Sequence, residues 1–166
     1  NIRITIPGFY DKVIDLSDKD KNEILKVKIN TIEFKNSIGI KELYGETDFS
    51  LTERIATRPT LDVNGIYGGY TGEGSKTVLP SEAHAKISMR LVPNQDWKEI
   101  SDLFKQYVLN FIPKSVTAKI KTHHGAEPYV TPTTSTAYEA AILAYKKSFG
   151  VNPFQQRGGG LSLIHI

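Results

Sequence analysis

The alternation of apolar and polar residues is clearest between positions 60 and 92. Residues 82–92, EAHAKISMRLV, carry Ala, Ala, Ile, Met and Leu at every second position, with His, Lys, Ser and Arg between them. Residues 60–66, TLDVNGI, also alternate, and a glycine-rich stretch separates the two segments. Because the side chains of a strand alternate between its faces, both segments are predicted to be strands with one apolar and one polar face. This pattern is typical of an antiparallel sheet that is covered on one side only.

Two segments have the apolar spacing of amphipathic helices. In residues 97–111 the apolar side chains recur at intervals of three and four, and Pro113 stops the helix. The second helix is predicted to begin at a Thr136 cap, with Glu139 completing a capping box, and to end at Gly150. Both helices are long enough to cover one face of a small sheet.

Weaker signals complete the pattern. Residues 2–6, IRITI, and residues 115–122, SVTAKIKT, alternate and predict two further strands. Ser17 and Ser50 each precede an acidic residue three positions later, which predicts that a capped helix follows each of them. Residues 30–48 predict no definite element. Together these elements predict an α+β fold, a two-layer sandwich in which a four-stranded antiparallel, ferredoxin-like sheet carries helices on one face.

The composition is that of a globular domain. The 166 residues are 39% hydrophobic and 23% charged, and the net charge of +3 comes from interspersed basic and acidic residues. Neither a nucleic-acid surface nor an apolar run of the ~18 residues that a membrane span needs is indicated. The absence of cysteine excludes a disulfide scaffold, a zinc ribbon and a thiol nucleophile. The sequence begins without Met and inside a predicted strand, so we expect a fragment of a larger protein. As a separate expectation, the location of that protein is the cytoplasm.

Residues 68–80, GGYTGEGSKTVLP, raise the question of a phosphate-binding P-loop. That motif needs Lys directly after Gly and a helix directly after the loop. Here Ser75 separates Gly74 from Lys76, and a strand follows instead of a helix N-terminus that would bind phosphate. The stretch is better explained as a long flexible connection between two strands, whose glycines permit positive φ and close approach to a ligand or partner.

Residues 58–93, RPTLDVNGIYGGYTGEGSKTVLPSEAHAKISMRLVP, resemble the lid (dimerisation) domain of the carnosine dipeptidase branch of di-zinc metallopeptidases. That superfamily also holds aminoacylases and succinyl-diaminopimelate desuccinylases. IPGFYDKV near the start resembles the family's approach to the lid, and HHGAEPYVTP resembles its exit. AYKKSFGVNPFQQRGGG resembles the helix and strand that return to the catalytic domain. The resemblance divides the chain into a lid domain, residues 1–124, and the start of a return segment, residues 125–166.

The resemblance implies a hydrolase of small peptides or acylated amino acids that uses two bridged zinc or manganese ions. In that family the metal ligands and the general base belong to the catalytic domain. This segment is therefore expected to hold no metal ligand and no catalytic residue, and to be inactive alone. His123 and His124 are adjacent and would point to opposite sides of an extended chain, which does not suit a shared ion. The implied partners are a second copy, forming a homodimer, and a dipeptide or acyl-amino-acid substrate, without nucleic acid or membrane.

Three residues carry the implied substrate contacts. Thr77 in SKTVLP matches a substrate-contacting threonine, and Arg90 in SMRLVP matches the arginine that grips the free carboxylate of the substrate. A guanidinium on the polar face of a strand is a natural bidentate partner for a carboxylate. His124, which precedes a glycine at the domain exit, is the third candidate. The alternatives stay open: a solvated charge for Arg90, a strand-start residue for Thr77 and a hinge position for His124.

The two ends depart from the family pattern. The lid histidine that polarises the scissile carbonyl from the partner subunit would precede Asn1 and is absent from this sequence. Residues 157–163 read RGGGLSL, so the family's substrate-contacting serine is displaced or replaced. Residues 161–166, LSLIHI, resemble a cloning or boundary artefact more than the family continuation, and His165 has no inferred role.

A different class of function remains as the alternative, namely a stand-alone ferredoxin-like module that binds RNA or a small ligand. Sheets that bind RNA expose aromatic side chains on their strands. The polar face of residues 82–92 carries none, and residues 115–122 offer only lysines. The sequence therefore favours the lid domain of a dipeptidase over this alternative.

Overall fold

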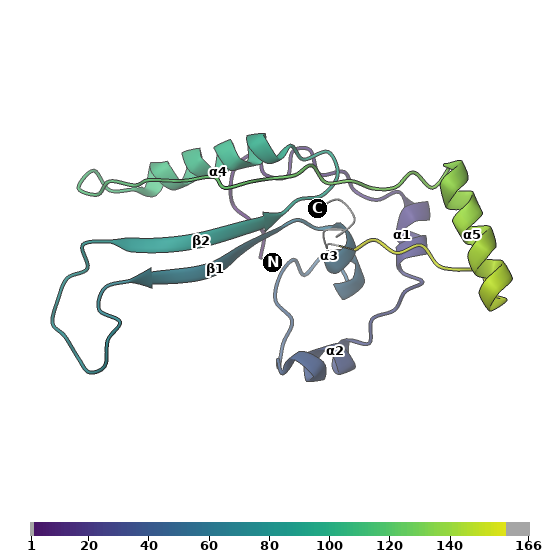
Figure 1. Cartoon of the computed structure of the whole chain (residues 1–166), viewed down its shortest axis with the longest axis horizontal. Helices are drawn as coiled ribbons and strands as arrows, with labels where there is room; N and C mark the ends of the chain where they lie inside the picture. The colour runs from purple at the N-terminus through teal and green to yellow at the C-terminus, as the bar shows by residue number, and fades with distance from the viewer. Residues whose placement is uncertain (1, 159–166) are drawn as a thin grey trace.

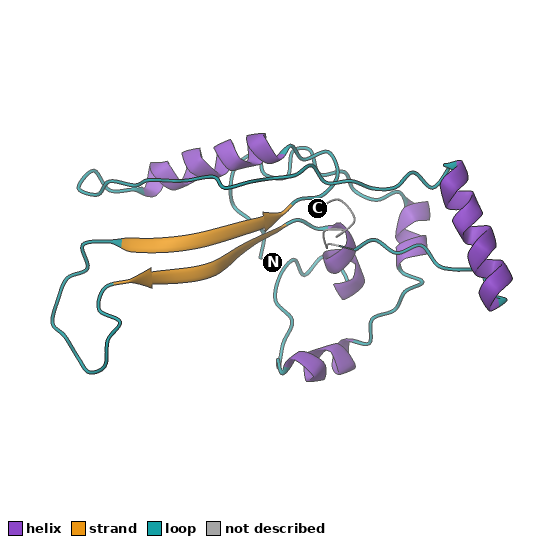
Figure 2. Cartoon of the chain, viewed as in Figure 1, coloured by secondary structure: helices purple, strands orange, loops and turns teal. Residues whose placement is uncertain are grey.

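The computed structural model describes residues 2–158 of the chain. Within this range it contains helices and one antiparallel hairpin (Figures 1 and 2), which confirms the predicted α+β class. In chain order the elements are α1 (Asp18–Ile24), α2 (Thr31–Ile38), α3 (Leu51–Thr57), β1 (Thr60–Gly68), β2 (Ala83–Arg90), α4 (Trp97–Phe111) and α5 (Thr136–Phe149). The hairpin and α4 lie together at one end of an elongated molecule, and α5 lies at the other end (Figure 1).

The hairpin is the predicted pair of strands, with one irregularity. Thr60 lies opposite Arg90, and the register shifts between Val63 and Gly65, where one extra residue of β1 forms a bulge. Because strand side chains alternate, the extra residue returns Ile66 to the face that carries Val63. Strict alternation would have turned Ile66 to the polar face. The bulge therefore lengthens the apolar face of the hairpin.

The core lies between the N-terminal segment, α4 and the adjacent half of the hairpin. Ile6, Phe9 and Ile100 are buried together, and Phe9 has no exposed surface. Partly buried apolar residues pack around them: Ile4, Tyr10, Leu61, Met89, Leu91, Leu103, Phe104 and Tyr107. α4 thus covers one face of the sheet, as the sequence predicted.

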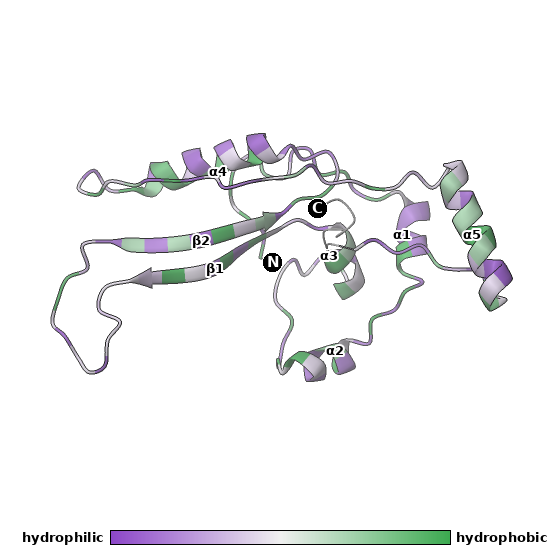
Figure 3. Ribbon diagram, viewed as in Figure 1, coloured by the Kyte–Doolittle hydropathy of each residue, from purple (hydrophilic) through white to green (hydrophobic). Residues whose placement is uncertain are grey.

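The far half of the same apolar face is uncovered. Val63 and Ile66 are 53% and 77% exposed, and Ala83 and Ala85 are also exposed. Figure 3 shows hydrophobic colour along both strands out to the loop end of the hairpin. The prediction of a continuous buried face over residues 82–92 is therefore wrong at its first half. Alternation determines which side chains share a face, but it does not determine how far the covering helix reaches.

Two predicted strands are wrong. Residues 2–6 and 115–122 have no strand assignment, so the described sheet has two strands and the four-stranded, ferredoxin-like sheet is not shown. Residues 115–122 run back along α4 instead (Figure 1), and the hydroxyls of Ser101 and Thr122 are hydrogen-bonded at 2.8 Å. An alternating sequence becomes a strand only where a neighbouring strand satisfies its backbone groups, and neither segment has such a neighbour in residues 2–158.

The capping box predicted at Ser50 is complete at the start of α3, whereas at the start of α1 only the Ser17 cap is present. The side chains of Ser17 and Ser50 accept the backbone N–H of Asp20 and Glu53, respectively. These bonds satisfy a donor that a helix leaves unpaired at its first turn. α2 lies in the segment for which the sequence predicted no definite element. None of the helices described for residues 2–158 is both long enough and apolar enough to cross a membrane.

α5 forms as predicted but packs poorly. Ser135, and not the predicted Thr136, caps the helix by accepting the N–H of Tyr138. Gly150 ends it with a φ of 71°, a left-handed conformation that favours glycine. No residue of α5 is buried, and Phe149 is 70% exposed. The apolar stripe of α5 therefore has no surface to cover within the described chain.

Candidate functional site

The polar face of the hairpin carries the first candidate, Arg90. Arg90 is the last residue of β2, its side chain is exposed, and Thr60 lies directly opposite on β1. The Thr60 hydroxyl donates to the carboxylate of Asp62 at 2.7 Å, and Asp62 lies opposite Ser88. This end of the hairpin therefore presents a guanidinium beside hydroxyls and one carboxylate, as the alternation of residues 82–92 predicted.

The loop end of the same face is aromatic. Tyr67 and His84 are cross-strand partners whose rings stack in parallel, with centroids 4.4 Å apart and an interplanar angle of 8°. Nε2 of His84 lies 3.4 Å from the carboxylate of Glu82. The stack fixes the two strand ends before the glycine-rich loop begins.

His124 lies in the extended segment that runs along α4. The next residue, Gly125, lies against Trp97 at the start of α4 so closely that a Cβ on it would be 2.3 Å from Cε3 of the indole. His124 is exposed and lies beside the N-terminal end of α4, which follows β2 after a short connection. The end of β2 and the start of α4 lie at the same end of the unit formed by the hairpin and α4 (Figure 1). Arg90, which ends β2, and His124, which is next to the Gly125 that contacts Trp97, therefore share that end.

Thr77 lies at the opposite end, in the exposed loop that joins the strands. β2 advances by about 3.3 Å per residue, so its length from Ala83 to Arg90 alone separates the loop from Arg90 by roughly 23 Å. The structure therefore brings Arg90 and His124 to one end of the hairpin and does not bring Thr77 to them. The predicted strand over residues 82–92 already implies this separation, because Thr77 precedes the strand and Arg90 lies near its far end.

A pocket of about 540 Å³ lies near the Arg90 end, between residues 2–6, the start of β1 and α4. Its apolar wall includes Ile4, Leu61, Phe104 and Tyr107. Its polar wall is built around Glu46, which is 6% exposed. A pocket of this size and composition is typical of sites that bind small molecules.

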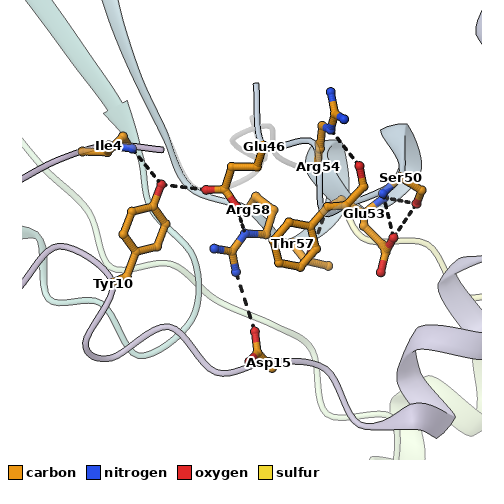
Figure 4. A network of polar contacts seen from close by, with 10 residues as sticks. Ile4, Tyr10, Asp15, Glu46, Ser50, Glu53, Arg54, Thr57 and Arg58 are labelled. Atoms are coloured by element: carbon orange, nitrogen blue, oxygen red, sulfur yellow. Dashed lines mark hydrogen bonds and ion pairs between the residues drawn. The ribbon is translucent and has the colours of Figure 1, made fainter. Parts of the chain in front are cut away.

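Ile4, Tyr10, Glu46 and Arg58, which line this pocket, belong to a network of polar contacts (Figure 4). The Tyr10 hydroxyl donates to Oε1 of Glu46 at 2.7 Å and accepts the N–H of Ile4 at 3.2 Å. Nε of Arg58 donates to Oε2 of Glu46 at 2.7 Å, and a second guanidinium nitrogen lies 3.8 Å from Asp15. Burial, and then the hydrogen bond to Glu46, raise the pKa of Tyr10 above its usual value.

Glu46 and Arg58 pair their charges with each other, and both side chains are nearly fully buried. The Arg58 guanidinium also lies over the rings of Phe49 and Tyr10, with 4.2 and 5.3 Å to the ring centroids. No sequence pattern singles out Glu46 or Arg58. Glu46 falls in residues 30–48, where no pattern marks a buried position. The network joins the N-terminal segment to the end of α3 and is a structural feature.

The described part of the chain offers no metal site. No group of three or more His, Cys, Asp or Glu side chains in residues 2–158 could hold a metal ion. His165 and the rest of residues 159–166 lie outside the described residues, so the departure noted there from the family pattern has no structural account.

Comparison with known proteins identifies the family. A family model described as the peptidase dimerisation domain matches residues 11–116. The chain belongs to this family, as the resemblance of residues 58–93 predicted. Because residues 11–116 include the hairpin and α4, the family match covers the unit that carries Arg90 and Thr77.

Curated relatives cover nearly the whole chain. Human Beta-Ala-His dipeptidase is 26% identical over 159 residues, which are 94% of this chain and 31% of the relative. Cys-Gly metallodipeptidase DUG1 of Candida albicans is 27% identical over 165 residues, which are 97% of this chain and 34% of the relative. The chain thus spans about a third of the length of the curated relatives it matches.

Solved structures agree with the fold. A metallo-carboxypeptidase of the M20 family from Sulfolobus solfataricus, Sso-CP2, matches with a TM-score of 0.83 and 36% identity, covering 98% of this chain and 37% of that one. Human carnosine dipeptidase 1 matches with a TM-score of 0.78 and 25% identity, covering 98% of this chain and 35% of that one. The whole described arrangement, including the isolated α5, therefore has counterparts in peptidase structures.

Proposed function

We propose that this chain is the substrate-binding lid and dimerisation domain of a metal-dependent dipeptidase that acts in the cytoplasm. The observation that carries the proposal is the family match, together with dipeptidase relatives that align with 94–97% of this chain but are about three times longer. The division into a lid, residues 1–124, and a return segment, residues 125–166, is part of the same proposal. The proposal also includes that the isolated domain is inactive.

The exposed apolar surfaces support a larger protein around this domain. α5 has no buried residue, and its apolar stripe faces solvent. The far half of the hairpin is equally uncovered at Val63 and Ile66. A two-stranded hairpin is marginally stable alone, and the four-stranded, ferredoxin-like sheet is proposed for the complete protein. Large exposed apolar surfaces on soluble domains often mark sites where another part of the protein or a partner binds.

The complete enzyme is proposed to use two zinc or manganese ions. The residues described here do not fit such a centre, because they contain no group of three or more potential ligands. The role of this domain is accordingly confined to binding and orienting the substrate. Orientation of a substrate against a catalytic group contributes substantially to rate because it removes rotational and translational freedom before the reaction.

Arg90 is proposed to bind the C-terminal carboxylate of a dipeptide or acyl-amino acid. A guanidinium forms two parallel charged hydrogen bonds with a carboxylate, which fix its position as well as its charge. His124, at the same end of the hairpin, is proposed to contact the same substrate. Both side chains are exposed, as a binding role in a lid requires.

Thr77 needs a second copy to take part. Two extended residues span at most about 7 Å, whereas the length of β2 alone separates Thr77 from Arg90 by roughly 23 Å. One copy therefore cannot bring both side chains to one dipeptide. In the proposed homodimer, the loop of one copy would supply Thr77 to the site that contains Arg90 of the other. This requirement links dimerisation to substrate binding.

The test is Arg90→Ala in the complete enzyme. Loss of a charged hydrogen bond to the substrate is expected to lower kcat/KM by about 2–3 kcal/mol, mainly through KM. Lys86→Ala is the matched control, because Lys86 is exposed on the same face of the same strand. A dipeptide amide, which lacks the carboxylate, should be hydrolysed equally by Arg90→Ala and wild type. An unchanged kcat/KM for the free dipeptide would refute the role of Arg90.

A further inference from the structure

The glycine-rich loop between β1 and β2 is folded around one aromatic side chain, Tyr70. The Tyr70 hydroxyl donates to the backbone carbonyl of Glu73 at 2.9 Å. Nζ of Lys76 lies 5.4 Å from the centre of the same ring, within the range of a cation–π interaction. The ring therefore contacts both the tip of the loop and the segment of the loop that leads back toward β2, although the loop as a whole is exposed.

The glycines are explained by this packing. A Cβ on Gly72 would lie 2.6 Å from the Tyr70 hydroxyl and 2.7 Å from the adjacent ring carbon, which is closer than van der Waals contact permits. Gly69 has a φ of +69° and lies against Pro80, whose ring would be 3.3 Å from a Cβ at that position. Glycine is thus required where the chain passes over the Tyr70 ring and where the two ends of the loop meet.

Thr77 is fixed by the same arrangement. The N–H of Val78 donates to the carbonyl of Lys76 at 3.0 Å, so Thr77 is the central residue of a three-residue turn. Lys76 is held by its main chain in this turn and by its ammonium over Tyr70. The position of Thr77 therefore depends on Tyr70 through its neighbour.

We propose that Tyr70 is a positioning residue that holds the loop in the shape in which Thr77 can contact a substrate. This inference rests on the proposed function, which assigns Thr77 to substrate binding. Tyr70 acts through two contacts, its hydroxyl on Glu73 and its ring beneath Lys76. The loop has little else to hold it, because every side chain from Gly69 to Glu82 is exposed.

The rate of tryptic cleavage after Lys76 measures how often the loop opens. Cleavage of the Lys76–Thr77 bond in the complete native protein follows the population of the open loop. Losing a hydrogen bond and a cation–π contact is expected to speed this cleavage about tenfold in Tyr70→Leu, and less in Tyr70→Phe, which keeps the ring. Gly72→Ala should also speed it, because its methyl group displaces the ring. Tyr129→Leu, another exposed tyrosine far along the chain, is the control and should leave the rate unchanged.

A double-mutant cycle with Thr77→Ala measures the effect on the reaction. Tyr70→Leu should raise KM severalfold when it is the only substitution. It should have no further effect on KM in the Thr77→Ala variant, because Tyr70 acts through Thr77. Tyr70→Phe should restore most of the loss. Equal effects of Tyr70→Leu in both backgrounds would overturn the positioning role. So would unchanged tryptic cleavage in both Tyr70→Leu and Gly72→Ala.

The two measurements separate this inference from the proposed function. If Thr77→Ala leaves KM and kcat unchanged, the proposed contact of Thr77 with substrate fails, and with it the positioning role. Faster cleavage in Tyr70→Leu would then show only that Tyr70 orders the loop. If Thr77→Ala impairs the enzyme while Tyr70→Leu does not, the proposed function stands and the inference about Tyr70 is wrong.

Discussion

Removing the Glu46 carboxylate tests whether the network beside the pocket holds the N-terminal segment in place. The side chains of Glu46 and Arg58 are 7% and 6% exposed and bonded at 2.7 Å. Glu46→Ala would leave the Arg58 guanidinium with only Asp15, 3.8 Å away and 89% exposed, as a carboxylate partner. It would also remove the acceptor of the Tyr10 hydroxyl. The variant therefore leaves a buried charge without its main partner and a partly buried hydroxyl without its acceptor.

The expected loss is large for a single substitution. Removing one partner of a buried ion pair costs about 3–5 kcal/mol, because the remaining charge stays buried without compensation. For a chain of this length each kcal/mol lowers Tm by about 2–4 °C, which gives a fall of roughly 6–20 °C. Thermal unfolding followed by circular dichroism and by the fluorescence of the single tryptophan, Trp97, measures this change.

Two further variants make the reasoning refutable. The double variant Glu46→Leu with Arg58→Met should be more stable than Glu46→Ala, because it leaves no buried charge behind. Lys105→Ala, which breaks the exposed ion pair with Asp102 at 3.1 Å, should cost under about 0.5 kcal/mol. If Glu46→Ala costs no more than Lys105→Ala, or if the double variant is no more stable than Glu46→Ala, Glu46 and Arg58 do not form a buried, coupled pair.

Two other predictions concern a helix cap and a close contact. Burial raises the pKa of Glu53, but its bonds from Ser50 and a nearby lysine outweigh this effect and leave the pKa below the usual 4.5. The ionised form of Glu53 thus adds stability above pH 4.5, and this stability is lost as the pH falls below 4.5. In urea unfolding, Glu53→Gln should therefore be less stable than wild type at neutral pH, and the difference should shrink below pH 4.5. A difference that does not change with pH would contradict this prediction. Gly125→Ala should push the Trp97 indole aside, red-shift its fluorescence emission and lower the free energy of unfolding by about 1–3 kcal/mol. Gly158→Ala, the control, has open space around it and should change neither the emission nor the stability. An unshifted emission in Gly125→Ala would contradict the close contact.

Elements that depend on near neighbours in the sequence were predicted well. The caps at Ser17 and Ser50 and the helix over residues 97–111 follow from spacing within a few residues, and the structure confirms them. The hairpin was also predicted, because two alternating segments joined by one loop most often pair with each other as neighbouring strands. At α5 the prediction chose Thr136 where Ser135 caps, because adjacent hydroxyl residues give the same local signal.

Predictions that needed a distant partner failed. Residues 2–6 and 115–122 alternate like strands but have no strand beside them in the described chain. The buried pair of Glu46 and Arg58 carried no sequence signal, because its burial is produced by the N-terminal segment that contains Tyr10. A hydrophobic pattern records which face of an element is apolar, and not which other segment covers it.

The sequence alone determined the family, the two faces of the hairpin and the residue types that can grip a carboxylate or contact a substrate. The tertiary structure decided where these residues lie: Arg90 and His124 at one end of the hairpin and α4, and Thr77 at the other, on a loop shaped by Tyr70. It also decided the core, in which the buried Gln95 side chain donates to the carbonyl of Phe9 across 86 residues of sequence. The physical reason is that propensity, alternation and capping act over a few residues, whereas burial and site geometry arise from contacts between segments that only folding brings together.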